Sequence, residues 1–534
     1  MRRIVLTILL CASGLLAACS KPACDVPLKL ALHWGGLLYS SLTCVAGDCG
    51  AELCCTGTFC PGTAVTLEAE ASEHHVVAWA GDCAAAGAGR KCELKMDAAR
   101  SIDLSFPLSK VSVRVDVTNA SGGHGRIVST PAGVDCDGSC STDVDYGTSL
   151  VLTAEGNPED GFVGWSGACT GSALTCTLPS TSDVQVGATF SLMNRMFVTS
   201  TTFPLPLTGG LAAADAACQA LATAAGLPGT YAAWLSDPSH DAKDRLGTAA
   251  GWIRTDGRLF APDTAGLVDL CEASQLATGV RYPPSLDESG HAVAADALVV
   301  TGTTSAGEAA IAQNEGEGGT CEGWTATTGL ALAGYAWSGC GMWTSGADVA
   351  CDGATAHLYC FGTDHQAATT RPAAQGRLAF VTAETYRGLT VAEADGHCAA
   401  EAAAAGRSGS FRALLATGSA SAISRFSTSG APWVRPDGVA IVAQAADLRH
   451  GTLLAPIALT AAGTSIGPWS GVHTGASTPD ATGSILGTCR DWASTDLYLH
   501  FDAGEPLLAN SQFFYRDAYN LPCNTPARYY CLEQ

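Results

Sequence analysis

The C-terminal part of this 534-residue chain carries one order of motifs twice, and no other feature restricts the possible fold as much. A Phe-Val-Thr run opens the first copy at 197–199 and the second at 380–382. An alanine-rich segment with one central cysteine follows each run and ends at a glycine, Gly226 or Gly406. Glycine readily takes the left-handed conformation that follows a helix, so each copy is predicted to hold one helix.

The remaining motifs keep the same order in both copies. The predicted helices span 212–225 and 391–405, a Trp-x-Arg-x-Asp-Gly motif lies at 252–257 and 433–438, a Thr-Cys-x-x-Trp motif lies at 320–324 and 488–492, and a Tyr-Cys pair lies at 359–360 and 530–531. Asp-Gly between apolar runs predicts a hairpin, and the Thr-Cys-x-x-Trp motif is predicted to be a strand. We therefore expect two domains of one fold, at 195–361 and 377–534, joined by a linker at 362–376.

A shorter repeat precedes the long one. Within 108–192, the run at 111–115 alternates apolar and polar residues, as a half-buried strand does. A second strand is predicted at 150–154, before a Trp-Ser-Gly-Ala-Cys turn. The segment 20–107 aligns with it loosely, and repetition at a period of about 85 residues predicts tandem domains. We expect two small all-β modules, at 20–107 and 108–192.

This shorter repeat resembles the divergent internalin-type B-repeat of bacterial surface proteins. The strand that precedes a Trp-x-Gly-x-Cys turn carries the resemblance, which is close over 108–192 and loose over 27–107. The resemblance implies a spacer or stalk without catalytic activity.

Residues 1–19 predict export. Arg2 and Arg3 precede a short apolar run that closes on Leu-Ala-Ala-Cys19, which is the pattern of a secretory signal. The run is too short to span a bilayer, which takes roughly 20 helical residues. The closing tetrapeptide resembles the bacterial lipobox, in which the cysteine is acylated and becomes the mature N-terminus. An ordinary signal peptide cleaved elsewhere is the alternative. We expect an exported chain anchored through Cys19 in the outer membrane or at the cell surface of a Gram-negative bacterium.

Charge and cysteine content restrict the class of protein further. Loss of Arg2 and Arg3 with the signal leaves 26 basic residues against 50 acidic ones, a net charge of −24. Such a charge disfavours nucleic acids as partners. Of 24 cysteines, 22 remain after Cys11 and Cys19 are set aside. An even number in an oxidising compartment predicts a disulfide framework.

The long repeat resembles the C-type-lectin-like, endostatin-like domain of bacterial lipoproteins, best known from spirochaetes. The Phe-Val-Thr strand, the helix with a central cysteine, the Thr-Cys-x-x-Trp motif and the terminal Tyr-Cys carry the resemblance. It implies a disulfide-rich α+β fold in each copy and a surface protein that binds host or matrix components. The resemblance also implies four disulfides: Cys218–Cys360, Cys321–Cys351, Cys398–Cys531 and Cys489–Cys523.

The other cysteines pair by simpler arguments or stay open. Three short-range pairs are expected to clip loops of the β modules: Cys83–Cys92, Cys136–Cys140 and Cys169–Cys176. Cys271 and Cys340 occur only in the first long copy, so they are expected to bond to each other. Six further cysteines, Cys24, Cys44, Cys49, Cys54, Cys55 and Cys60, allow 15 connectivities, and the sequence does not choose among them.

No metal or cofactor is expected. Animal C-type lectins hold calcium with a Glu-Pro-Asn or Gln-Pro-Asp loop, and here the nearest sequence is Glu505 with Pro506 and Leu507. Leucine offers no oxygen ligand to a hard cation. Sugar binding by stacking needs exposed aromatic residues, and the candidates are Tyr335, Trp337, Trp343, Phe513, Phe514 and Tyr515. Their packing within the domains is the alternative.

Catalytic motifs are weak. The Gly-x-Ser-x-Gly pattern at 463–467 is followed by a loop-type sequence, whereas a nucleophile elbow needs a strand before it and a helix after it. His74 and His75 lack a third ligand. The acidic cluster of Asp135, Asp137, Asp143 and Asp145 lacks calcium-loop spacing. We therefore expect a non-enzymatic surface lipoprotein that binds an extracellular protein or glycan. A calcium-independent lectin is the first alternative, and a secreted hydrolase with an unrecognised site is the second.

Overall fold

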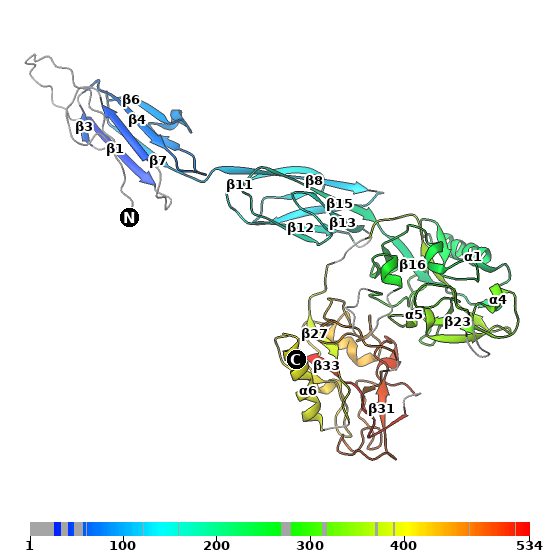
Figure 1. Cartoon of the computed structure of the whole chain (residues 1–534). Coiled ribbons are helices and arrows are strands. Elements are labelled where there is room, and N and C mark those ends of the chain that lie inside the picture. Colours follow the sequence, from blue (N-terminus) through cyan, green and yellow to red (C-terminus); the bar gives the residue numbers. More distant parts are fainter. Residues whose placement is uncertain are drawn as a thin grey trace, which may run out of the picture.

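The computed structural model describes most of the chain. The described residues are 26–33, 41–46, 57–59, 61–120, 122–157, 160–268, 279–311, 318–368, 372–387, 390–468, 470–517 and 520–534. The expected signal peptide with Cys19 lies outside them, as do Cys24, Cys49, Cys54, Cys55, Cys60 and Cys271. In Figure 1, two slender β modules follow one another and lead to two broader domains that lie side by side. The broader domains are called the first head and the second head below.

The second β module is a sandwich of two four-stranded sheets. One sheet has the order β11-β8-β15-β13 and the other β10-β9-β12-β14. The strands are β8 Lys110–Ala120, β9 Gly125–Thr130, β10 Asp135–Cys136, β11 Ser139–Asp145, β12 Leu150–Gly156, β13 Asp160–Gly167, β14 Thr175–Leu178 and β15 Val184–Leu192. Strand β12 buries Leu150, Leu152 and Ala154 and turns the residues between them outward, which is the alternation read from its sequence.

The first β module repeats this topology. Its sheets have the orders β3-β1-β7-β5 and β2-β4-β6, and β1 runs parallel to β7 just as β8 runs parallel to β15. The strands are β1 Val26–His33, β2 Ser41–Ala46, β3 Gly57–Phe59, β4 Ala64–Glu70, β5 Ala78–Gly81, β6 Lys91–Lys95 and β7 Arg100–Ser105, with a short helix η1 at Ala84–Ala86. The indole of Trp79 donates to the Gly89 carbonyl (2.8 Å), and that of Trp165 donates to the Ala173 carbonyl (2.6 Å), so both modules fix the same turn.

The first head is built on a five-stranded sheet of order β18-β26-β16-β19-β20, with a smaller sheet in which β23 pairs with β21, β22 and β24. Its strands are β16 Asn194–Val198, β17 Phe203–Pro204, β18 Tyr231–Ala233, β19 Trp252–Arg254, β20 Leu259–Ala261, β21 Leu298–Val300, β22 Gly318–Gly319, β23 Leu330–Tyr335, β24 Ala347–Ala350, β25 Thr355–Ala356 and β26 Tyr359–Gly362. Its helices are α1 Gly210–Ala224, α2 Ala242–Arg245, α3 Thr264–Leu267, α4 Cys321–Trp324 and α5 Met342–Ser345.

The second head repeats the central part of this arrangement, with the order β28-β33-β27-β29 and a second sheet β30-β31-β32. Its strands are β27 Arg377–Val381, β28 Phe411–Ala413, β29 Trp433–Val434, β30 Val472–His473, β31 His500–Gly504, β32 Asn520–Pro522 and β33 Tyr530–Glu533. Its helices are α6 Val391–Ala404, η2 Ile423–Arg425, η3 Ala445–His450 and η4 Ser511–Phe513. The long helices α1 and α6 confirm the two helices predicted from the alanine-rich segments.

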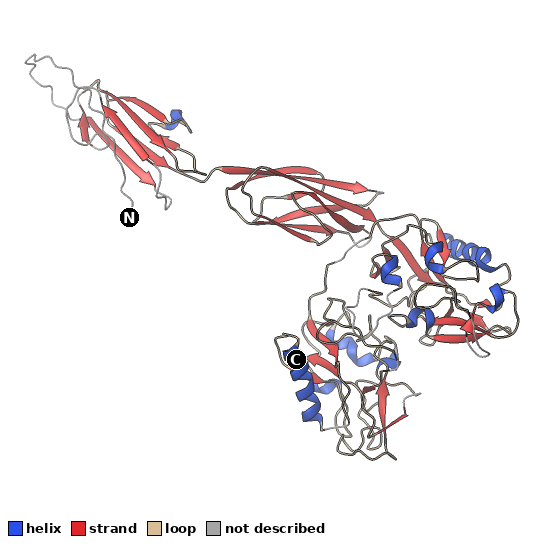
Figure 2. Cartoon of the chain, in the orientation of Figure 1, coloured by secondary structure: helices blue, strands red, loops and turns tan. Residues whose placement is uncertain are grey.

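The described chain is mostly β structure in small sheets, with few helices (Figure 2). It also contains many disulfides. None of the helices in its described part is long and apolar enough to cross a membrane.

The Thr-Cys-x-x-Trp motif was predicted to be a strand, and that prediction is wrong. In the first head, Cys321, Glu322, Gly323 and Trp324 have φ values of 46°, 48°, 71° and 68°. In the second head, Cys489, Arg490, Asp491 and Trp492 have φ values of 48°, 58°, 55° and 67°. Four successive left-handed residues are costly for side chains other than glycine. The indoles offset part of this cost, because Trp324 donates to the Ser236 carbonyl (3.0 Å) and Trp492 to the Ala416 carbonyl (2.9 Å).

Candidate functional site

Three of the six candidate stacking residues belong to the hydrophobic core. Trp343 is 1% exposed, and Phe513 and Phe514 are fully buried. The hydroxyl of Tyr359 donates to the Trp343 carbonyl (2.7 Å), and that of Tyr530 donates to the Phe513 carbonyl (2.7 Å), so these aromatic residues close equivalent loops in the two heads. Their role as a sugar-stacking surface was predicted wrongly, because the loops fold back onto the domains.

The other three candidates are half-buried. Trp337 donates from its indole to the Val293 and Ala294 carbonyls (both 3.1 Å) and packs against the cores of both heads. Tyr335 packs in an apolar cluster shared by the two heads. Tyr515 lies beyond helix η4 in the second head. Trp337 and Tyr335 thus join the heads to each other.

The remaining polar candidates are buried or contact other side chains of the protein. Glu505 is fully buried and pairs with Arg516 (Nη1–Oε2 3.3 Å), which removes it from any calcium loop. The ring of His74 stacks on Tyr146 at 3.6 Å between centroids and so joins the two β modules. Ser465 is fully buried in a loop. Among the residues that the structure describes, no group of three or more His, Cys, Asp or Glu side chains is placed to hold a metal ion.

Disulfides fix the loops of both heads and both modules. The structure contains Cys218–Cys360, Cys321–Cys351, Cys398–Cys531 and Cys489–Cys523 in the heads, and Cys83–Cys92, Cys136–Cys140 and Cys169–Cys176 in the modules. These are the pairs expected from the sequence. Cys340 is also disulfide-bonded, whereas Cys271, its expected partner, lies outside the described residues. In each head one bond ties the long helix to the last strand.

An exposed apolar loop on the second head was not singled out from the sequence. Ile485, Leu486, Leu497 and Tyr498 are 67%, 60%, 53% and 83% exposed, and they make up four of the seven exposed large hydrophobic residues in the described chain. The left-handed turn separates the two pairs and holds the first one, since the amide of Arg490 donates to the Ile485 carbonyl (2.8 Å). We call these four residues the apolar loop. The Cys489–Cys523 bond lies in the same part of the second head.

The two heads contact one another through main-chain and side-chain hydrogen bonds. The amide of Ala509 donates to the Trp337 carbonyl (2.8 Å), and the Asn510 side chain donates to the Ala295 carbonyl (2.6 Å). The amide of Ala440 donates to the hydroxyl of Tyr282 (3.1 Å). Backbone groups paired across the boundary hold the heads in one orientation.

A cleft of about 470 Å³ lies between the heads. The turns of both Trp-x-Arg-x-Asp-Gly hairpins line it at Gly257 and Gly438, and Arg258, Arg281 and Tyr282 also face it. Pro372 and Ala373 of the linker close one side. The repeated Trp-x-Arg-x-Asp-Gly motif was the only sign of this cleft in the sequence. The sequence alone does not show that the two hairpins meet where the heads contact each other.

Two arginine–aspartate pairs belong to the hairpins beside this cleft, and Asp437 of the second pair is one of its lining residues. Arg254 holds Asp256 with two hydrogen bonds, and Arg435 holds Asp437 in the same way. Burial alone would raise the pKa of Asp256, but hydrogen bonds and charge from Arg254 and Arg258 lower it to about 2. Burial likewise opposes Arg435 and Arg281 at Asp437, and these arginines hold the pKa of that carboxyl below its ordinary value. Both carboxylates are therefore charged at neutral pH.

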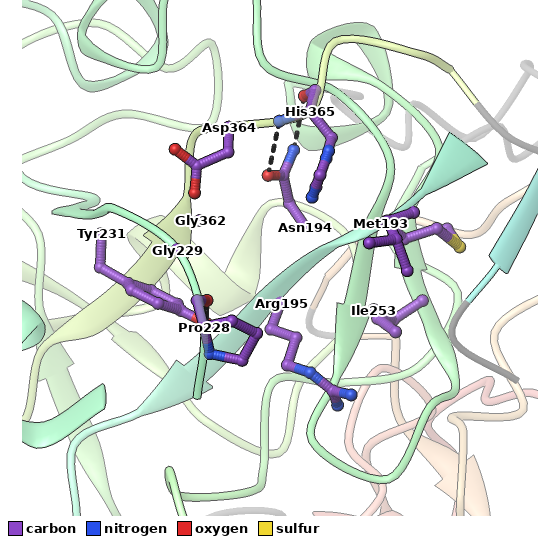
Figure 3. Close-up of a pocket in the computed structure, with 11 residues that line it drawn as sticks. Met193, Asn194, Arg195, Pro228, Gly229, Tyr231, Ile253, Gly362, Asp364 and His365 are labelled. Atoms are coloured by element: carbon purple, nitrogen blue, oxygen red, sulfur yellow. Dashed lines mark hydrogen bonds between the residues drawn. The ribbon is translucent and has the colours of Figure 1, made fainter. Parts of the chain in front are cut away.

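A second cavity, of about 340 Å³, lies where the second module meets the first head (Figure 3). Asn194 donates to the Ala250 and His365 carbonyls (2.8 and 2.6 Å) and accepts from the His365 amide (3.1 Å). Burial raises the pKa of Tyr231, which lines the cavity, to about 12. These hydrogen bonds hold the start of β16 against the loop at Ala250 and the segment at His365.

One family model matches part of the chain. Residues 115–194 match the model of the divergent InlB B-repeat domain, which supports the resemblance of the second module. No curated protein matches the chain.

Solved structures give distant similarities. The Bacillus anthracis TIE protein aligns with 34% of this chain at 10% identity and a TM-score of 0.19, and this chain spans 38% of its length. The major pilin from Streptococcus pyogenes aligns with 31% of this chain at 9% identity and a TM-score of 0.13, over 96% of the pilin. A pilus-presented adhesin, Spy0125 (Cpa), aligns with 24% of this chain and 36% of its own at 6% identity and a TM-score of 0.12. TM-scores this low do not establish a common fold.

Proposed function

We propose that this chain is a non-catalytic surface lipoprotein whose two lectin-like heads bind an extracellular macromolecule, a matrix protein or a glycan. The β modules act as the stalk, and the lipid on Cys19 ties the stalk to the outer membrane. The lectin-like assignment is supported by the Cys218–Cys360 and Cys398–Cys531 bonds, which join helix and last strand at matching places in two successive domains.

The apolar loop carries the proposal. Exposing Ile485, Leu486, Leu497 and Tyr498 together has a cost in water that a monomeric surface seldom bears without a partner. The left-handed turn and the Cys489–Cys523 bond hold this loop in place before binding, so little ordering entropy is lost when a ligand arrives. Tyrosine at such a place offers both an apolar ring and a hydroxyl.

The test is binding of the chain without residues 1–19 to immobilised matrix proteins and glycans. We expect binding that survives a chelator and that falls at least tenfold in a Leu497→Ser, Tyr498→Ser variant. Ile311→Ser is the matched control, because Ile311 is 75% exposed on the first head. Equal binding by wild type and both variants would contradict the role of the apolar loop. Labelling by a broad hydrolase probe without any binding would contradict the non-catalytic function.

The anchor has its own test. In a bacterium fed labelled palmitate, we expect the wild-type chain to carry the label and to partition into detergent. A Cys19→Ala variant that kept both properties would contradict the lipid anchor.

A further inference from the structure

Arginines outnumber aspartates around the cleft between the heads. Asp256 pairs with Arg254 and Asp437 pairs with Arg435, and both of these arginines are buried, at 4% and 5% exposure. Arg258 and Arg281 also approach the two carboxylates. Four arginines against two aspartates leave two positive charges at this place, although the whole chain has a net charge of −22.

Not all hydrogen-bond donors of the Arg281 guanidinium have a partner in the part of the protein that the structure describes. Its Nη1 lies 3.6 Å from the Asp437 carboxylate, which is beyond hydrogen-bond distance. Its Nε is buried, and no hydrogen-bond partner for it is present among the described residues. Arg281 is 33% exposed and Arg258 is 35% exposed, so both guanidinium groups reach the open side of the cleft. The exposed part of the Arg281 guanidinium is therefore open to an anionic ligand.

The walls of the cleft favour a ring-shaped ligand. The guanidinium groups of Arg254 and Arg258 lie 5.8 and 5.9 Å from the centre of the Tyr282 ring, which keeps that ring in one position. Pro262 and Pro372 add flat apolar rings to the lining. A cavity of about 470 Å³ with apolar walls and few polar groups is of the size that binds small organic molecules.

We propose that this cleft binds one carboxylated sugar, of the hexuronic acid type, with Arg281 and Arg258 on its carboxylate and the Tyr282 and proline rings against its carbon–hydrogen face. The inference rests on the proposed binding function and names a ligand class for a second site, separate from the apolar loop. A fork of guanidinium donors suits a planar carboxylate. The surrounding negative charge disfavours long polyanions, so the ligand is a single acidic sugar within an otherwise neutral glycan.

The experiment titrates the chain without residues 1–19 with methyl glucuronoside, followed by NMR of the sugar. Methyl glucoside tests the need for the carboxylate, and N-acetylglutamate amide tests whether an acidic side chain of a peptide serves as well. We expect saturable binding of the glucuronoside that weakens as salt rises, and at least tenfold weaker binding of the other two compounds. Arg281→Gln is expected to weaken binding of the glucuronoside at least tenfold.

Arg412→Gln is the matched control, because it removes one positive charge from an exposed site on strand β28. We expect it to leave binding unchanged. Unaltered binding by Arg281→Gln, or equal binding of methyl glucoside, would overturn the carboxylate site. Equal binding of the glutamate compound would overturn the sugar as its ligand. No glucuronoside binding by a chain that still binds on the matrix and glycan arrays would overturn this inference and leave the proposed function standing.

Discussion

The two heads share a framework, and one buried position that holds valine in the first head holds histidine in the second. Each has a helix aspartate held by an arginine thirty residues later, Asp215 by Arg245 and Asp395 by Arg425. Val300 in the first head and His473 in the second each precede a threonine. The hydroxyl of that threonine donates to a carbonyl in the equivalent loop of its own head, at Thr344 or Phe514. Val300 and His473 are both fully buried, but the histidine places a titratable group where the valine places none. The aspartate–arginine pair is thus common to both heads, whereas the buried histidine at this position is found in the second head and not in the first.

The largest expected effect tests the shared framework. Removing Cys218–Cys360 or Cys398–Cys531 opens a loop of 142 or 133 residues. The chain-entropy model gives about 5 kcal/mol for each and about 2 kcal/mol for the seven-residue loop of Cys169–Cys176. We therefore expect Cys→Ala pairs to destabilise both heads by similar amounts and the second module by less, as measured by regional hydrogen exchange. A head that kept its protection without this bond would break the equivalence of the two.

The framework could be predicted because its signals are local or repeated. Helices α1 and α6 follow from alanine-rich runs closed by Gly226 and Gly406, and the strand alternation of β12 follows from its sequence. The left-handed turn at Cys489 was missed because four successive residues with positive φ oppose their own backbone preferences. Tertiary contacts such as the Trp492 hydrogen bond help to stabilise it.

The second prediction concerns the buried histidine of the second head, His473. Burial lowers the pKa of His473 from 6.5 to about 4, although its bond to the Tyr386 carbonyl opposes the shift. The folded state therefore binds a proton less readily than the unfolded state between about pH 6.5 and 4, so the second head loses stability as pH falls through this window. The full loss is about 3 kcal/mol, from about 1.4 kcal/mol for each pKa unit.

A His473→Val variant adopts the residue of the first head and is expected to remove this acid sensitivity. Hydrogen exchange of the second head at pH 7.5 and 4.5 measures it, and the first head, with Val300, is the internal control. Because other groups titrate too, the comparison is between wild type and variant at each pH. An equal loss of protection in both would show that His473 does not cause the sensitivity of the second head.

The candidate site shows where sequence reasoning reaches its limit. Trp343 and Phe513 were chosen because aromatic residues in glycine-rich loops resemble a stacking surface, yet the same composition folds back into a core. The apolar loop and the interhead cleft depend on exposure and on contacts between domains. Gly257 and Gly438 are far apart in the chain, and nothing in either hairpin motif states that the two turns line one cavity.

The smallest expected effect concerns the start of the two long helices. Helix α6 begins with a capping box, in which the Thr390 hydroxyl accepts from the Glu393 amide (3.4 Å) and the Glu393 carboxylate accepts from the Thr390 amide (3.0 Å). Helix α1 begins after Gly209 and has no side-chain cap. Losing a threonine cap costs about 1 kcal/mol. We expect Thr390→Ala to speed hydrogen exchange in the first turn of α6 about fivefold, a factor that corresponds to that cost.

Thr208→Ala is the matched control, since Thr208 precedes α1 and is exposed. We expect no change in the first turn of α1, because that helix starts without a side-chain cap and depends on its packed face, where Ala214, Cys218 and Ala222 are buried. Equal acceleration of both helices would mean that the two starts are stabilised in the same way. No acceleration in α6 would mean that the Cys398–Cys531 bond and the packed face hold the first turn without its cap. The cap would then be a redundant difference between two equivalent helices.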